Sequence, residues 1–314
     1  MRGIWLKRSI AALAVAASVL PAAAAGAQGQ QADEIVVTAR RTGIPVWRVT
    51  GAKTSLVLIG SIDGVAKDTR WDPAALTATL RKADRVMFPG MMALTGSPFA
   101  LIGYFVKFKR QARLPKGQSL AQMMPPAQFQ RLVALRKRGI LKAGFESRHP
   151  LHLADDLRDL ARGKSGYGVD ADEYVFRAVR KHKIKTVPLK TMTAKPLLQE
   201  YFKIPPQRFV PCLLDTVALV EAGPGTVKAR SDAWAERRVP DVIASPADKV
   251  VETCSPKSFG LVPRPDLSLQ TKRLLAEPQL TVAVVDVRSL ARPGGVLDDL
   301  AAAGFQIQGP GWKR

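Results

Sequence analysis

Short apolar runs alternate with longer amphipathic stretches along the chain, and this alternation predicts the secondary structure. Residues 46–49 (VWRV) and 56–59 (LVLI) are apolar runs on either side of a glycine-containing turn, which predicts a β-hairpin. Asp72-Pro73 then begins a helical pattern, with Asp72 in the N-cap position. Residues 85–88 predict the next strand, so the chain passes from strand to helix to strand as an α/β fold does.

The middle of the chain is expected to be mainly helical. Residues 91–165 are rich in basic side chains and predict a helical insertion. Within it, residues 99–116 combine apolar side chains with cations, which is typical of a membrane-facing segment and also of a helical lid packed on the core. Farther along, Asp170 is expected to cap a helix, and residues 186–189 predict a short strand after it.

The C-terminal pattern resembles that of the opening strand. Residues 282–285 predict a strand, followed by a loop, a helix at 296–303 and a strand at 305–307. LVLIG followed by SID thus corresponds to VAVVD followed by VRS, as in a divergent internal repeat. The patterns together predict an α/β fold, with a mixed central sheet flanked by helices and a helical insertion. Both strand ends are expected to converge on one cleft, lined by Gly60, Ser61, Asp63, Asp286 and Lys190.

The N-terminus has the pattern of a secretory signal peptide. Residues 1–8 carry three cations and no acid, residues 9–25 are apolar and alanine-rich, and Ala25-Gly26-Ala27 is a small-x-small cleavage signal. We therefore expect a signal peptide over 1–27, a flexible leader over 28–44, one domain over 45–314 and a periplasmic or secreted protein. Residues 33–41 (DEIVVTARR) predict a strand, and they also resemble the energy-coupling box of TonB-dependent outer-membrane receptors.

The net positive charge of the chain indicates which kinds of binding partner to expect. The chain has 314 residues and a formal net charge of +22, and removal of the signal peptide takes away three cations and no acid. For an exported protein this charge favours an anionic polysaccharide or a membrane surface as partner, and nucleic acid is not expected. A generally cationic, solvated surface without a specific partner is the alternative, and the sequence indicates no particular protein partner.

Two cysteines follow the leader, Cys212 and Cys254. An even number of cysteines in an oxidising compartment predicts a disulfide between them. Two separate buried thiols are the alternative.

The sequence contains few residues with obvious chemistry. It has no G-x-S-x-G, P-loop, H-E-x-x-H, G-x-G-x-x-G or C-x-x-C motif, and no cofactor is expected. His149 and His152 are separated by two residues, but Pro150 places a helix start between them, so no metal site is predicted. Asp63 and Asp286 are candidates for a paired-carboxylate site, and the simpler interpretation of Asp63 is a residue that caps its own turn.

The layout resembles the TraB/GumN family, which is related to the Tiki-type metalloproteases. The resemblance rests on VWRV, LVLIGSID and ADRVMF, on LPKGQSLAQMMPP and GVDADEYVFRAVRKHKIKTVPLKT, and on DAWAERRVPD and TVAVVDVRSLARPGGVLDDLAAAGF. It implies an α/β domain with a helical insertion. It also implies a metal site with a G-x-x-H after the first strand, an acid after the second strand and a G-x-x-H-like turn near the C-terminus.

This chain departs from that pattern at every position that would hold the metal. Asp63 stands in place of the first histidine, Pro89 in place of the acid and Ser289 in place of the second histidine, and Lys190 replaces a further glutamate. The departures favour an exported, degenerate metallohydrolase that binds a ligand. The alternative is a divergent hydrolase, with or without a metal, whose candidate catalytic residues are Asp63, Ser289 and Arg288.

Overall fold

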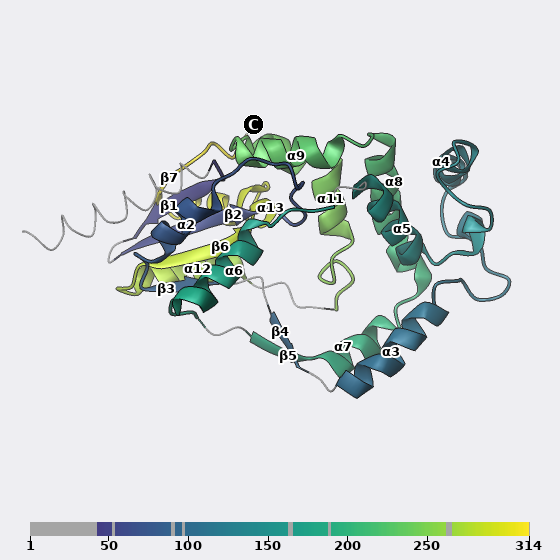
Figure 1. Ribbon diagram of the computed structural model, residues 1–314, viewed down its shortest axis with the longest axis horizontal. Coiled ribbons are helices and arrows are strands. Elements are labelled where there is room, and N and C mark those ends of the chain that lie inside the picture. The colour runs from purple at the N-terminus through teal and green to yellow at the C-terminus, as the bar shows by residue number, and fades with distance from the viewer. Residues whose placement is uncertain are drawn as a thin grey trace, which may run out of the picture.

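The computed structural model describes residues 43–313 except for 52–53, 89–91, 96–97, 163–165, 188–189 and 262–265. Within this part the strands form a five-stranded sheet in the order β3-β6-β2-β1-β7 (Figure 1). These strands are β1 (Val46–Thr50), β2 (Ser55–Ser61), β3 (Arg85–Met87), β6 (Thr281–Asp286) and β7 (Gln306–Gln308). The mixed sheet flanked by helices confirms the predicted α/β class. The predicted signal peptide, nearly all of the leader and Pro89 lie outside the described residues.

Strand direction is mixed because a single strand runs against the others. β2 and β3 each pair with β6 in parallel, whereas β1 pairs antiparallel with both β2 and β7. β1 and β2 form the predicted hairpin, and the N–H of Gly51 donates to the Thr54 carbonyl, 2.8 Å away, to close its turn. Every residue of β2 is buried, as expected for a strand covered on both faces.

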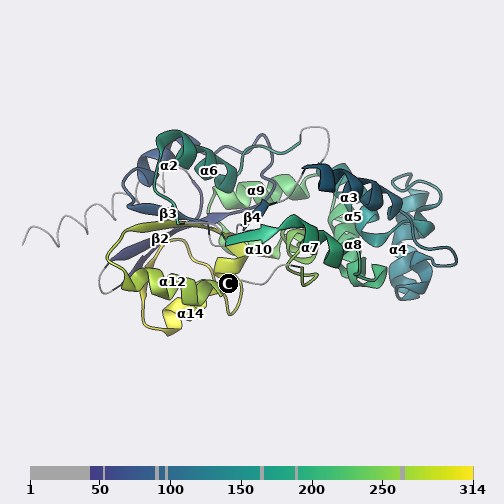
Figure 2. The same cartoon turned by 90° about the horizontal axis from the view of Figure 1, so that it is seen from below.

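The helices divide between the two faces of this sheet (Figure 2). α2 (Pro73–Leu80) and α6 (Ala171–His182) pack together on one face, and α12 (Leu267–Ala276) and α14 (Val296–Ala302) pack together on the other. β2 therefore leads to α2 on one face, while its neighbour β6 leads through α13 (Val287–Ala291) to α14 on the opposite face. Adjacent parallel strands whose connections leave to opposite faces form a topological switch point, where α/β proteins place their binding sites.

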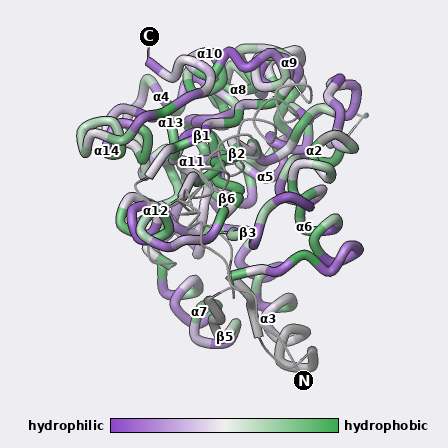
Figure 3. Tube along the Cα trace, turned by 90° about the vertical axis from the view of Figure 1, so that its left-hand side faces the viewer, coloured by the Kyte–Doolittle hydropathy of each residue, from purple (hydrophilic) through white to green (hydrophobic). Residues whose placement is uncertain are grey.

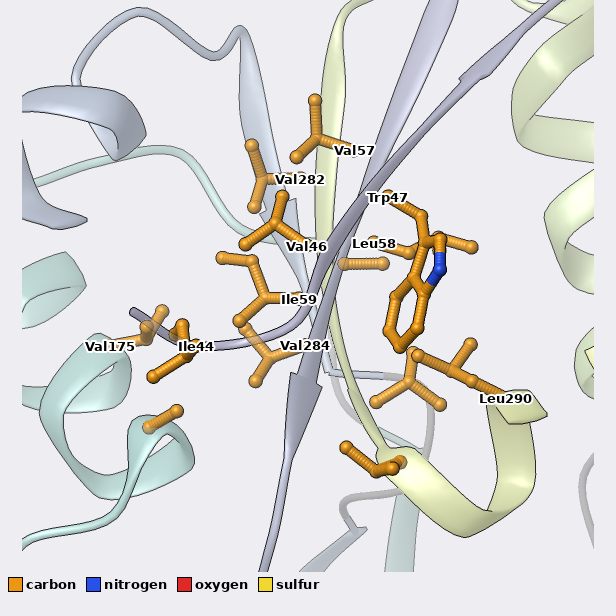
Figure 4. Packing of buried hydrophobic residues seen from close by; sticks show 14 of the residues in the cluster. Ile44, Val46, Trp47, Val57, Leu58, Ile59, Val175, Val282, Val284 and Leu290 are labelled. Atoms are coloured by element: carbon orange, nitrogen blue, oxygen red, sulfur yellow. The ribbon is translucent and has the colours of Figure 1, made fainter. Parts of the chain in front are cut away.

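The main hydrophobic core surrounds β2 and β6. Figure 4 shows Leu58 on the same side of the sheet as Trp47 and Leu290, and Ile59 on the side of Val175. Figure 3 colours the chain by hydropathy and shows hydrophobic positions concentrated on the central strands. The fully buried Trp47 donates from its indole nitrogen to the Pro310 carbonyl, 2.9 Å away, which fixes the C-terminal segment on the sheet.

Five further helices lie at a second hydrophobic cluster beside the sheet. They are α3 (Pro98–Arg110), α4 (Pro126–Lys137), α5 (Pro150–Arg162), α7 (Ala194–Tyr201) and α8 (Val210–Glu221). The cluster draws on residues 114–157 of the expected insertion and also on residues 209–220. A small parallel sheet of β4 (Met92–Thr95) and β5 (Lys190–Thr193) is separate from the central one.

Three helices connect the sheet with this second cluster: α9 (Thr226–Ala235), α10 (Val239–Ala244) and α11 (Pro246–Thr253). The predicted disulfide is confirmed, since Cys212 on α8 is bonded to Cys254 just after α11. Among the described residues no single helix is long and apolar enough to span a membrane. One pair bent by 89°, 206–221 with 226–235, meets the length and composition criteria, and much of α8 is buried in the second cluster.

Three predicted elements differ in detail. Within the predicted helical insertion, β4 (Met92–Thr95) is a strand and not a helix. Residues after β6 were expected to form a loop, but Asp286 caps α13 directly after the strand. Of the predicted strand at 186–189, Thr186 forms a single parallel bridge to Val86, and β5 begins only at Lys190.

Candidate functional site

The candidate site is a cavity of about 580 Å³ at the carboxyl ends of β2 and β6. Ser61 and Asp286 are register partners in these two parallel strands, so the turns that follow them start side by side. Leu197 of α7, Val251 of α11 and Leu267 of α12 complete the walls. The cavity thus lies at the topological switch point defined by the sheet.

The lining of this cavity is acidic although the whole chain is strongly basic. Its lining acids are Asp63, Asp172, Asp248, Glu252, Asp266, Asp286 and Asp299, and its lining cations are Lys257, Arg288 and Arg292. With seven acids against three cations, the cavity itself does not suit a polyanion. An anionic partner would have to meet the basic exterior.

Asp63 lies at the edge of the cavity on a turn that a buried arginine holds in place. Its side chain is exposed, and its backbone carbonyl accepts a hydrogen bond from Nη2 of Arg230. The same nitrogen donates to the Gly64 carbonyl, 3.2 Å away, and Gly64 has a φ of +73° that favours glycine. Arg230 comes from α9 and its side chain is only 2% exposed. The turn therefore has a structural support far away in the sequence.

Asp286 organises the second turn. Its Oδ2 accepts hydrogen bonds from the backbone N–H of Ser289 at 2.9 Å and from the Ser289 hydroxyl at 2.8 Å. Its Oδ1 accepts from the backbone N–H of Arg288 at 3.3 Å, so one carboxylate caps the start of α13. The Ser289 hydroxyl is thereby committed to Asp286.

Arg288 is held by three partners on α10 and α11. Its Nε donates to Asp248 at 2.5 Å, its Nη1 to Glu252 at 3.1 Å, and its Nη2 to the Ile243 carbonyl. Asp63, Ser289 and Arg288 all line this cavity, but Ser289 bonds to Asp286, and Arg288 bonds to α11 and α10.

Asp172 is a site residue that the sequence interpretation missed. It lies in the first turn of α6, and its Oδ2 accepts a hydrogen bond from the Ser61 hydroxyl, 2.6 Å away. Burial raises the pKa of Asp172 to about 7. The Ser61 hydrogen bond opposes this shift, and the nearby carboxylates of Asp170, Asp286 and Asp63 add to it. A signal was present, because residue 172 shares the helix face of Val175 and Val179, which an amphipathic pattern marks as buried.

Asp248 and Arg230 form a second buried pair that was not predicted. Their side chains are 3% and 2% exposed, with 3.9 Å between Oδ1 and Nη1. Burial raises the pKa of Asp248 to about 6, and the guanidiniums of Arg288 and Arg230 oppose this shift. These residues lie on α11 and α9, far in sequence from either strand end, and only the tertiary packing brings them together.

Of the other residues singled out in the sequence, Gly60, His149 and His152 lie outside the lining of this cavity. Gly60 lies in β2, where its carbonyl accepts a hydrogen bond from the indole nitrogen of Trp234 at 2.8 Å. Lys190 begins β5 in the separate small sheet, and its side chain lies outside the described part. His149 and His152 are buried in the second cluster, where the His152 ring lies 4.3 Å from that of Phe108.

The donor set at the strand ends does not fit a transition-metal site. In the part of the chain that the structure describes, no three His, Cys, Asp or Glu side chains are disposed to hold a metal ion. Ser289 stands where the resemblance implies the second histidine. Its hydroxyl is a poor ligand for a transition metal and is already bonded to Asp286.

Comparison with known proteins places the chain in a family. The sequence profile of the TraB/PrgY/gumN family matches residues 45–309, which is most of the chain, and the protein therefore belongs to that family. The expectation from the sequence motifs is confirmed. No curated protein and no solved structure matches the chain.

Proposed function

We propose that this protein is an exported member of the TraB/PrgY/gumN family that has lost metal-dependent hydrolysis and binds a ligand in the strand-end cavity. The observation that carries this proposal is the contact between Asp286 and Ser289. At the place where the resemblance implies a metal-binding turn, the carboxylate caps α13 and binds the neighbouring hydroxyl. These hydrogen bonds hold the turn through the chain's own side chains, and a cavity of about 580 Å³ lies beside it.

The proposal for export rests on residues 1–27 and on the basic mature chain. Expression of the whole chain in a Gram-negative host, followed by N-terminal sequencing of the periplasmic fraction, is expected to give a mature protein that starts near Gln28. An uncleaved chain in the cytoplasm would contradict export.

The loss of metal chemistry is tested by the metal content of that mature protein. Protein purified without chelators is expected to contain far less than one equivalent of zinc or manganese by elemental analysis. Addition of either metal is expected to leave the unfolding temperature unchanged, because a native-state site would raise it by mass action. A tightly bound equivalent of metal would overturn this part of the proposal.

The proposed partner of the basic exterior is an anionic polysaccharide or an anionic membrane surface. Co-sedimentation with vesicles of phosphatidylglycerol is expected at low ionic strength and is expected to weaken as salt is added. Vesicles of phosphatidylcholine alone are the control. Binding that is equal for both lipids, or absent from both at low salt, would contradict a membrane partner.

A further inference from the structure

We propose that Ser61 and Asp172 form a nucleophile–base pair that hydrolyses short carboxylic esters in the strand-end cavity. This goes beyond ligand binding, and it rests on the proposed function only for the position of the ligand. It also differs from a site built on Asp63, Ser289 and Arg288, because its two residues already make the contact that the chemistry needs.

The geometry places both groups at the wall of the cavity. Ser61 is the last residue of β2, and Asp172 lies in the first turn of α6, which Asp170 caps. The Ser61 hydroxyl and Asp172 Oδ2 are 2.6 Å apart, within the range for an O–H donor and a carboxylate acceptor. A nucleophile within hydrogen-bond reach of its base is the arrangement that activates a serine.

Two of the carboxylates that raise the pKa of Asp172 already have other partners. Asp286 caps α13, and Asp170 caps α6 through the N–H of Glu173. The hydrogen-bond partner that the described structure assigns to Asp172 is the Ser61 hydroxyl. Asp172 is therefore the acid whose position matches the role of base.

The electrostatics of the cavity support this role. Burial raises the pKa of Asp172 to about 7, and the carboxylates that face it, Asp170, Asp286 and Asp63, hold it there. A base that is half ionised near neutral pH can take a proton in one step and return it in the next. An ordinary exposed aspartate, with a pKa near ~4, would be too weak a base.

The reaction needs only water besides the ester. The Ser61 oxygen bonds to the acyl carbon while its proton passes to Asp172, and the bond from the acyl carbon to the alcohol oxygen then breaks. Asp172 gives its proton to the departing alcohol oxygen. Water next attacks the acyl carbon while Asp172 takes one of its protons, and the bond from the acyl carbon to the Ser61 oxygen then breaks. Asp172 returns the proton to that oxygen, and the products are one acid and one alcohol.

The cavity also limits the substrate. A volume of about 580 Å³ suits a small ester rather than a polymer, and the acidic lining disfavours a substrate that bears a free carboxylate. We therefore expect neutral or amine-bearing esters of short acyl chains.

The test uses the mature protein and a biotin-linked fluorophosphonate, which forms a stable adduct with an activated serine. One adduct is expected, located on Ser61 by peptide mapping, and Ser61→Ala is expected to abolish it. Ser147→Ala is the matched control, because Ser147 lies in the helical part and its hydroxyl bonds to the Gly144 carbonyl, 3.0 Å away. Circular dichroism and urea unfolding check that each variant is folded.

The role of the base is tested by the rate of labelling against pH. The wild-type rate is expected to rise with pH, with a midpoint near the pKa of Asp172, and Asp172→Asn is expected to lower it at least ~100-fold. Asp172→Glu, which keeps a carboxylate, is the second variant should the first not fold, and it is expected to restore part of the rate. Release of p-nitrophenol from p-nitrophenyl butyrate is expected to follow the same pattern.

Absence of an adduct on Ser61 in folded wild-type protein would overturn the proposal, as would equal labelling of Asp172→Asn. These outcomes are distinct from failure of the proposed function, which is decided by metal content. An equivalent of bound zinc would overturn the loss of metal chemistry whether or not Ser61 is labelled.

Discussion

Arg230, on α9, donates to the backbone carbonyl of Asp63 in the turn after β2, although 167 positions separate the two residues in the chain. The contact fixes the first turn of the cavity from outside the sheet. Asp63 thus has its main chain held by a buried cation, while its carboxylate faces the cavity edge.

Replacement of Arg230 with methionine should destabilise the protein strongly. The side chain is only 2% exposed, and its removal leaves the carbonyls of Asp63 and Gly64 without their donor and Asp248 without one counter-charge. We expect a loss of about 2–4 kcal/mol in the free energy of unfolding, from urea titrations. Arg238→Met is the control, because Arg238 is 49% exposed and its pairs with Glu236 and Asp241 are expected to contribute less than about 1 kcal/mol. Equal effects of the two variants would show that Arg230 does not support the turn.

Replacement of Asp172 with asparagine should change how stability depends on pH. The pKa of Asp172 is raised to about 7 in the folded protein, whereas an unfolded aspartate titrates near ~4. Between these values the folded state holds the proton and the unfolded state does not, so this group makes stability fall as pH rises. Asp172→Asn removes this pH dependence. As the pH rises from 5 to 8, the free energy of unfolding of the variant should therefore increase by on the order of 2 kcal/mol relative to that of the wild type. A difference between the two proteins that is constant with pH would contradict the raised pKa.

Reduction of the Cys212–Cys254 disulfide should destabilise the helical cluster. The bond links residues 42 positions apart, and closure of a loop of that length is worth about 4 kcal/mol in the chain-entropy model. Wild-type protein in reducing agent and the double variant Cys212→Ser/Cys254→Ser should show the same lowered urea midpoint. An unchanged midpoint on reduction would mean that the cross-link adds nothing to stability.

Replacement of Gly60 with alanine should disturb the core next to the cavity. A Cβ at this position would lie 2.7 Å from Val287 Cγ2 and 2.9 Å from the ring of Trp47, both in the buried core. We expect a loss of about 1–3 kcal/mol from overpacking, measured by thermal unfolding. Gly311→Ala is the control, since a Cβ there meets no atom within 4 Å and should leave the unfolding temperature nearly unchanged.

Local patterns were sufficient for the strands and for several helix starts. The apolar runs predicted β1, β2 and β6, and the N-cap residues Asp72 and Asp170 accept the expected backbone N–H bonds, from Ala74 at 3.0 Å and Glu173 at 2.8 Å. These features depend on neighbours within one turn or on alternation along one strand, so they can be inferred from a short window of sequence. The predicted loop after β6 was wrong because the Asp286 carboxylate accepts hydrogen bonds from the backbone N–H groups of Arg288 and Ser289. These N-cap bonds start α13 in a sequence with no strong helical pattern.

The sequence by itself determined the family, the α/β class, the cysteine pair and the two strand ends as the place for a site. Only the tertiary structure decided which side chains occupy that place. Parallel pairing of β2 with β6 brings Ser61 beside Asp286, α6 adds Asp172, and α9 and α11 add the buried pair of Arg230 and Asp248. The physical reason is that burial and charge in the cavity depend on residues more than a hundred positions apart. The pKa of Asp172 is therefore set by how the helices pack on the sheet, and no local pattern records it.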